Sequence, residues 1–395
     1  MNQRQKQLQK GHTEEKEEET VFEKLELWNP DVTIEPPEFY VPKSDPLFLL
    51  FQNLYFKTKE IYQQLPKRKN GEIAFIHPLN IVRFLKKAKI TNVATLCTGL
   101  IHDYIEESVD IYKEQNHMTE DPSGIKNLDI YEEYITTTLQ QELTTFCKEH
   151  NLNPSTITPI IEATKILTRH KRDFYYASIS GIFEHKNESI REIAIQVKLA
   201  DRTHNILCIE GFTEEARIFQ CFKNLFILNN TKKYLLEKTS QNPSTEKLFK
   251  KCAKATYCAF LTCGHLVRLK GIAEITPMLQ LAFKKYALEE GGLWAVTEVH
   301  TGNTHLTRLF QGIVRKWDAR LHHEWNTFNE KKQVEEQFVK EFFKSKNYTS
   351  EQITAIVDYK DAYSLKEVIA YLMYNKEYII SKFVSSDLTA KRRIE

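Results

Sequence analysis

The sequence predicts an all-α protein: a helical bundle followed by a mostly helical C-terminal accessory region. Apolar residues recur at helical spacing in most windows, as in Leu47, Leu50, Phe51 and Leu54. No alternating run of useful strand length occurs before residue 236. Glycine and proline are scarce, with 12 of each in 395 residues, which favours long uninterrupted helices.

The predicted elements follow in order. A tail rich in Lys, Glu and Gln precedes a proline-rich extended lead-in, and the two cover residues 1–45. A helix is expected from 47 to 65, where Pro66 ends it, and His77-Pro78 opens the next after a basic loop. A third helix is expected from Asn92 through Glu107, then a polar loop at 108–128. Further helical patterns lie at 129–149, 155–168, 173–185, 188–209 and 213–236.

Ser240–Lys247 has the composition of a linker. It divides a bundle at 46–239 from an accessory domain at 248–395, which is also a candidate surface for homo-oligomerisation. Helices are expected at 248–268 and 275–290, and the β-branched and aromatic stretch 293–300 is compatible with one short strand.

The amino-acid composition limits which binding partners and which cellular compartment are expected for this protein. Net charge is only +2, from 55 basic and 53 acidic residues, which argues against a broad nucleic-acid or membrane surface. The seven cysteines are odd in number and include no CxxC, so reduced thiols in the cytoplasm are expected. The N-terminus lacks the apolar core of a secretory signal, and no run of 18 apolar residues predicts a transmembrane helix.

Two imidazoles and two carboxylates are the most informative residues: His77, His102, Asp103 and Asp201. Such a set can hold one divalent metal and leave positions for water. A metal with open positions can activate water for attack on phosphorus. The adjacent His102 and Asp103, near a helix end, can converge on one ion while His77 and Asp201 arrive from other helices.

The sequence around these residues resembles that of the HD-type hydrolase domain of the RelA/SpoT family. The motifs are RKNGE at 68–72 with FIHPL at 75–79, GLIHDYIEES at 99–108 and VKLADRTHNI at 197–206, in family order. The resemblance covers about residues 45 to 235. Residues 240–395 contain no sequence motif of the family's synthetase domain. It implies an HD-domain helical bundle that removes the 3′-pyrophosphate of guanosine tetra- and pentaphosphate. The expected metal is Mn²⁺ or another divalent ion.

The resemblance also implies roles for acidic residues after the His-Asp pair. Glu106 lies four residues after His102, so on one continuous helix it would share their face. Glu106 and Glu107 are expected to position water and move protons, although the family has Asp at the second position. Without the motif context, both would be read as solvated surface acids.

Nucleotide contacts are implied for four further residues. Arg68 is expected to stack on the guanine base, and the neighbouring Lys69 is expected to contact phosphates electrostatically. Asn205, one turn after Asp201, is expected to contact the sugar, and Lys165 in the ATKIL segment to bind phosphate. A basic surface loop and a solvent-facing helix lysine remain the alternatives for Arg68 and Lys165.

Arg202 and His204 are expected to point away from the metal, with structural roles, and Arg202 to pair with a carboxylate. The predicted function is metal-dependent hydrolysis of guanosine tetra- and pentaphosphate to GDP or GTP and pyrophosphate. The alternatives are an HD phosphohydrolase for another nucleotide and a non-hydrolytic nucleotide sensor.

Overall fold

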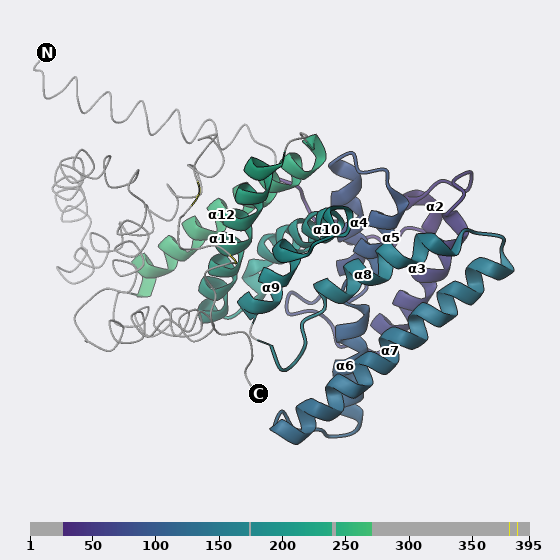
Figure 1. Cartoon of the computed structure of the whole chain (residues 1–395). Helices are drawn as coiled ribbons and strands as arrows, with labels where there is room; N and C mark the ends of the chain where they lie inside the picture. Colours follow the sequence, from purple (N-terminus) through teal and green to yellow (C-terminus); the bar gives the residue numbers. More distant parts are fainter. Residues whose placement is uncertain (1–26, 174, 239–241, 271–378, 380–384, 386–395) are drawn as a thin grey trace, which may run out of the picture.

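The computed structural model describes residues 27–173, 175–238 and 242–270, together with 379 and 385. Within these residues every element is helical and no strand occurs, so the all-α prediction is confirmed there (Figure 1). The α-helices are α2 (Pro37–Tyr40), α3 (Phe48–Gln63), α4 (Ile76–Lys87), α5 (Val93–Ile101), α6 (Tyr104–Gln115), α7 (Pro122–Glu149), α8 (Ile157–Leu167), α9 (Tyr175–Glu184), α10 (Glu188–Leu207), α11 (Glu214–Glu237) and α12 (Pro243–Lys270). Short 3₁₀ turns are η1 (Pro154–Thr156) and η2 (Ile209–Gly211). The predicted strand at 293–300 lies outside the described residues.

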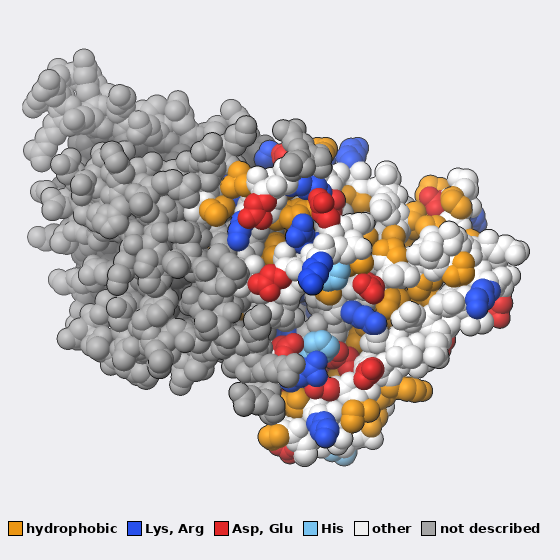
Figure 2. Space-filling model, viewed as in Figure 1, with side chains coloured by type: hydrophobic (Ala, Val, Ile, Leu, Met, Phe, Trp, Pro, Cys, Tyr) orange, Lys and Arg blue, Asp and Glu red, His pale blue; other side chains and the backbone are white. Residues whose placement is uncertain are grey.

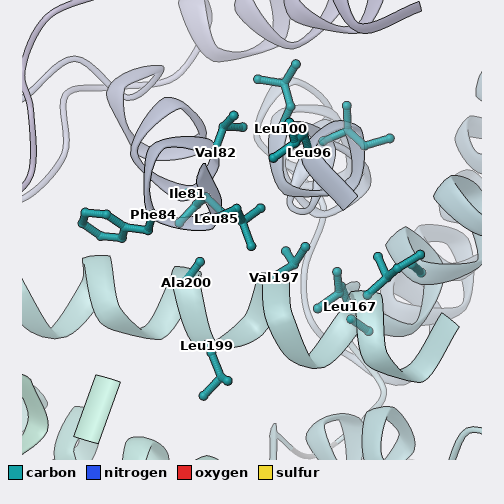
Figure 3. Close-up of a cluster of buried hydrophobic side chains, with 14 of the residues drawn as sticks. Ile81, Val82, Phe84, Leu85, Leu96, Leu100, Leu167, Val197, Leu199 and Ala200 are labelled. Carbon is teal, nitrogen blue, oxygen red and sulfur yellow. The ribbon is translucent and has the colours of Figure 1, made fainter. Parts of the chain in front are cut away.

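Helix α10 forms the centre of the bundle. It packs against α4, α5 and α8, and also against α9, α11 and α12. Figure 3 shows why one helix can serve both sides: Val197 and Ala200 point toward α4, whereas Leu199 points the opposite way. All three are fully buried, so α10 buries apolar side chains on opposite faces.

Gly99 lies where α4 and α5 approach each other. A Cβ added there would lie 2.6 Å from Cδ1 of Leu85, so a larger residue would force that buried side chain to move. The two helices carry His77 at one end and lead into His102 at the other, so their spacing sets the distance between the two imidazoles.

Side-chain caps define several helix starts. Asn92 accepts the Ala94 N–H at the start of α5, and Asn187 accepts the N–H groups of Ser189 and Ile190 at the start of α10. Pro78 lies in the first turn of α4, as predicted, where its missing N–H leaves no intrahelical bond unmade.

The proline-rich lead-in is anchored to α4. The Asp31 N–H donates to Asn80 Oδ1 and Asn80 Nδ2 donates to the Asp31 carbonyl, both at 2.9 Å. Arg83 Nη2 donates to the Thr33 carbonyl at 2.6 Å. Trp28 stacks on Phe84 with ring centroids 5.3 Å apart. These contacts also fix the amide orientation of Asn80, which matters for the site below.

Two predicted boundaries are wrong. The helix expected from Asn92 through Glu107 is two helices, because the chain turns at His102-Asp103, where Asp103 has φ −104° and ψ 4°. The polar loop expected at 108–128 is mostly helical: α6 continues to Gln115, and Asp121 caps α7 by accepting the Gly124 N–H. Polar composition there reflects one exposed helix face, since Ile105 and Val109 are buried.

Helix α12 begins inside the stretch expected to be a linker. Pro243 occupies its first turn, and Asn242 Oδ1 accepts the N–H groups of Ser244 and Thr245. Its residues Leu248 and Phe249 are buried where α12 packs on α10 and α11. This part of the sequence assigned to the accessory domain therefore lies on the bundle itself.

None of the described helices combines the length and hydrophobicity needed to cross a membrane. Cys97, Cys147, Cys208, Cys221 and Cys252 are free thiols, and all of them except Cys208 are buried. Figure 2 shows acidic and basic side chains interspersed over the described face, which agrees with the balanced composition.

Candidate metal centre

Three parts of the bundle bring the four predicted metal ligands together. His77 lies in the first turn of α4, His102 and Asp103 form the turn between α5 and α6, and Asp201 lies within α10. His77 Nε2 is 3.2 Å from His102 Nε2, and 3.5 Å from both Asp103 Oδ2 and Asp201 Oδ1. His102 Nε2 is 3.0 Å from Asp103 Oδ2. The break in the helix makes this possible, because it turns both neighbouring side chains toward one point.

These separations fit one shared cation. Donor atoms at about 2.0–2.2 Å from a metal lie roughly 3.0–3.5 Å from one another in octahedral or tetrahedral arrangements. The separations of 3.0–3.5 Å found here match that range. His77, His102 and Asp201 are at most 3% exposed, whereas the Asp103 side chain is 24% exposed. The set is closed by protein on one side and open toward Asp103.

Electrostatics keep both carboxylates ionised. Burial alone would raise their pKa values, but the His102 imidazole lowers the pKa of Asp103 well below its usual range. Lys198 does the same most strongly for Asp201, whose pKa is also low despite full burial. The ligand atoms of His77, His102 and Asp201 all lie within 4.8 Å of one another, and the partly exposed Asp103 carboxylate adjoins both imidazoles. This donor set is suited to a divalent ion.

Lys198 belongs to the centre although sequence reasoning did not select it. Its Nζ lies 2.9 Å from Asp201 Oδ2, and its side chain is only 13% exposed. Burial lowers the pKa of Lys198, but Asp201 more than offsets this, so the ammonium stays charged. Its position could have been predicted from the spacing, because a residue three positions before Asp201 lies on the same face of the helix.

His204 lies behind His77, so the prediction that it points away from the metal residues is wrong. The two Nδ1 atoms are 2.9 Å apart, and His204 Nε2 is 3.2 Å from Asn80 Nδ2. His204 is completely buried, and burial lowers its pKa well below the usual value. It is three residues after Asp201, which places it beside the same centre.

Arg202 points away from the centre, as predicted, but it meets amides instead of a carboxylate. It donates to Asn224 Oδ1 at 2.7 Å and to Gln220 Oε1 at 2.6 Å. These bonds attach α10 to α11. The difference arises because the neighbouring helix could not be identified from sequence.

The two residues expected to hold a nucleoside lie beside the metal ligands. Arg68 Nη2 donates to Asn205 Oδ1 at 2.9 Å, across 137 positions of sequence. Asn205 Nδ2 in turn donates to Asp201 Oδ1. Lys69 lies apart from this chain of contacts, with its Nζ 4.9 Å from the centre of the Phe212 ring.

The predicted catalytic acids occupy the first turn of α6. Because the helix breaks before them, the expectation that Glu106 shares a continuous helix face with His102 and Asp103 is wrong. Glu106 lies 3.4 Å from Arg169 Nη2 and 4.0 Å from Lys171 Nζ. Glu107 is the acid coupled to the centre: burial, and then the charge of Asp103, raise its pKa to about 8.

Tyr62 of α3 also lies near Asp103 and Glu107, and no motif in the sequence indicated this. Its hydroxyl is buried and has no hydrogen-bond partner among the described residues. Burial raises its pKa well above the usual value, and Asp103 and Glu107 raise it further while Arg68 lowers it. An unpaired hydroxyl beside the centre is a group that a ligand or water would satisfy.

Lys165 is not among the residues that contact the four predicted metal ligands. It is exposed and lines a cavity of about 510 Å³ whose walls come mainly from α7 and the segment after α8. None of His77, His102, Asp103 and Asp201 contributes to that lining.

Over the described residues, fold and site together define a helical bundle with a His-Asp cluster able to hold a divalent cation. Over 198 residues the chain is 28% identical to a GTP pyrophosphokinase of Myxococcus xanthus. The matched region is 47% of this chain and 21% of that protein, so the chain corresponds to about a fifth of its relative's length. No family model and no solved structure matches the chain.

Proposed function

We propose that this protein is a metal-dependent pyrophosphohydrolase of the RelA/SpoT HD type, which releases the 3′-pyrophosphate of guanosine tetra- or pentaphosphate and leaves GDP or GTP. One observation carries the proposal: the four converging ligand atoms lie directly beside the Arg68–Asn205 pair. The similarity to an enzyme named for pyrophosphoryl transfer to GTP supports a guanine nucleotide as the substrate.

His77, His102, Asp103 and Asp201 would hold the metal, for which we propose Mn²⁺. When bound, such an ion supplies Lewis acidity to a phosphoryl oxygen and lowers the pKa of water. The phosphoryl group would approach from the side where Asp103 is partly exposed. Lys198 keeps Asp201 ionised and so preserves the ligand charge.

The neighbouring side chains assign the remaining roles. Arg68 offers a planar guanidinium for stacking on guanine, and Asn205 offers its amide to the ribose. Glu107, with a pKa of about 8, exchanges a proton near neutral pH and is the better placed acid-base group. Glu106 holds Arg169 and Lys171 near the mouth of the site, where both cations can attract phosphate.

The decisive experiment is product analysis of the purified full chain with guanosine tetraphosphate and Mn²⁺, beside an EDTA control. We expect metal-dependent release of GDP and intact pyrophosphate. Asp201→Asn should abolish release, whereas Glu246→Gln, an exposed acid of α12 paired with Lys250, should not change it.

Two other outcomes separate the alternatives. Turnover of a different nucleotide in a panel would identify an HD phosphohydrolase with another substrate. Tight Mn²⁺ and nucleotide binding without any turnover would identify a sensor. Pyrophosphate transfer from ATP to GTP, in place of hydrolysis, would overturn the proposal.

A further inference from the structure

The segment between α8 and α9 carries four consecutive basic residues, each of which faces an acid on α6 or α7. Arg169 and Lys171 face Glu106, and Lys171 Nζ also lies 2.6 Å from Asp110 Oδ1. The other two residues face α7: His170 meets Glu132, and Arg172 meets Asp129. The metal centre described above uses none of the α7 acids.

The imidazole of His170 and two α7 carboxylates converge on one point. Asp129 and Glu132 are three residues apart on α7, so they share a helix face. His170 Nδ1 is 2.5 Å from Glu132 Oε1. One ligand atom from each of the three residues lies within 4.8 Å of the others. Glu132 is only 8% exposed, and the Asp129 side chain 20%.

One carboxylate oxygen in this group has no partner. Asp129 Oδ2 accepts from Arg172 Nη1 at 3.0 Å, but Asp129 Oδ1 is buried and makes no hydrogen bond among the described residues. A buried carboxylate oxygen without a partner is unfavourable, and a cation is a partner that would satisfy it.

Space for further ligands adjoins the three side chains. Asp129, Glu132 and His170 all line the cavity of about 510 Å³, which is large enough for several waters. Lys126, Lys165 and Arg172 also line it and weaken its field for cations. Arg172 is already bound to Asp129 Oδ2, which leaves Oδ1 free for another partner.

We propose that Asp129, Glu132 and His170 form a second divalent-cation site, separate from the centre at His77. One imidazole and two carboxylates suit Mn²⁺ or Zn²⁺, and waters in the cavity complete the coordination. The inference does not depend on the proposed hydrolysis, because it concerns binding of the ion alone.

Occupancy has a consequence for the first site. An ion shared by α7 and His170 would fix the segment whose neighbouring residues, Arg169 and Lys171, contact Glu106. A cation bound there would therefore restrain the two basic side chains that contact Glu106.

The test counts Mn²⁺ ions bound to the metal-free full chain, by titration with electron paramagnetic detection of free Mn²⁺ at pH 7.5. Mn²⁺ is chosen because it avoids thiolate sites such as the Glu72–His204–Cys208 group. We expect two ions per wild-type chain and one in His170→Ala. Glu132→Gln, which preserves the side-chain shape, should also bind one, and His150→Ala, an exposed histidine at the C-terminal end of α7, should bind two.

A variant of the first centre keeps the two sites distinguishable. His102→Ala should retain one ion, and adding His170→Ala to it should remove that ion. Wild-type binding of a single ion that His102→Ala abolishes and His170→Ala leaves unchanged would overturn the second site. A single ion lost in His170→Ala but kept in His102→Ala would instead overturn the first centre and leave this site standing. Melting temperatures and circular dichroism of each variant confirm that it is folded.

Discussion

The Nδ1 atom of His204 lies 2.9 Å from the Nδ1 atom of His77, while Nε2 of His77 faces His102, Asp103 and Asp201. One ring nitrogen of His77 is thus held by a buried neighbour, and the other is presented to the metal ligands. His204 is held in turn by Asn80, whose orientation is set by the backbone of Asp31. The lead-in before the bundle therefore contributes to the geometry of the centre.

We expect His204→Ala to weaken Mn²⁺ binding at this centre by about 10–100-fold, because residues that orient a ligating histidine typically contribute that much. The measurement is the Mn²⁺ dissociation constant in the His170→Ala background, where only this centre remains. His150→Ala serves as the matched histidine control. An unchanged constant in a folded variant would show that His204 does not position His77.

Asp103→Asn should abolish turnover while the protein stays folded. The substitution removes one ligand charge at the most exposed of the four ligands, whose side chain is 24% exposed, so little packing is lost. The checks are the rate of pyrophosphate release and the melting temperature in EDTA. Full activity in Asp103→Asn would contradict the metal mechanism.

Arg68→Ala should mainly raise KM and leave kcat nearly unchanged, because the guanidinium binds the base in ground state and transition state alike. Arg68→Lys should not restore KM, since an ammonium neither stacks as a plane nor forms the fork that reaches Asn205. The measurement is KM and kcat of wild type, Arg68→Ala and Arg68→Lys by steady-state kinetics. A large loss in kcat at unchanged KM would assign Arg68 to the chemical step instead.

Glu107 should make stability depend on pH. Its pKa rises from the ordinary 4.5 to about 8 in the folded chain, so the folded protein binds more protons than the unfolded chain between these values. The contribution of Glu107 to the free energy of unfolding is therefore fully present at low pH and is lost as the pH rises toward 8. In EDTA, the melting temperature of wild type should fall relative to Glu107→Gln between pH 5 and about pH 8.5. Parallel curves would contradict the raised pKa.

The same substitution tests catalysis. Glu107→Gln should lower kcat by about 10²–10⁴-fold if Glu107 transfers a proton, and should remove the pH-rate inflection near 8. Retention of that inflection would assign it to another group. Mn²⁺ affinity is measured alongside, because an effect on binding alone would indicate a structural role.

Two glycines offer a paired test of the core. Gly99→Ala should destabilise the protein by about 1–3 kcal/mol, because its Cβ would force Leu85 away from α5. Gly181→Ala, at an exposed position of α9 with no atom within 4 Å of the added Cβ, should stabilise it by about 0.5–1 kcal/mol. Urea unfolding followed by circular dichroism measures both. Equal effects would show that α4 and α5 are not so closely packed.

Helical periodicity and motif wording were enough to predict the all-α class and to select His77, His102, Asp103 and Asp201. The all-α class is confirmed within the described residues, because helix spacing is a local property. The four side chains lie close together, and their role as metal ligands stays a prediction. Arg68 and Asn205 were selected by resemblance, and the structure places them 2.9 Å apart. Helix boundaries were less predictable: the polar face of α6 resembled a loop, and Asn242 and Pro243 resembled a linker although they start α12.

What the sequence by itself determined is the class of fold and the residues of the candidate metal centre. Only the tertiary structure decided that the helix turns at His102-Asp103, that His204 supports His77, and that Arg202 meets amides of α11. It also separated Lys165 from the centre and brought His170 to the acids of α7. The physical reason is that periodicity specifies which face of a helix is buried, but not which helix covers it. Every one of these relationships depends on the partner across that contact.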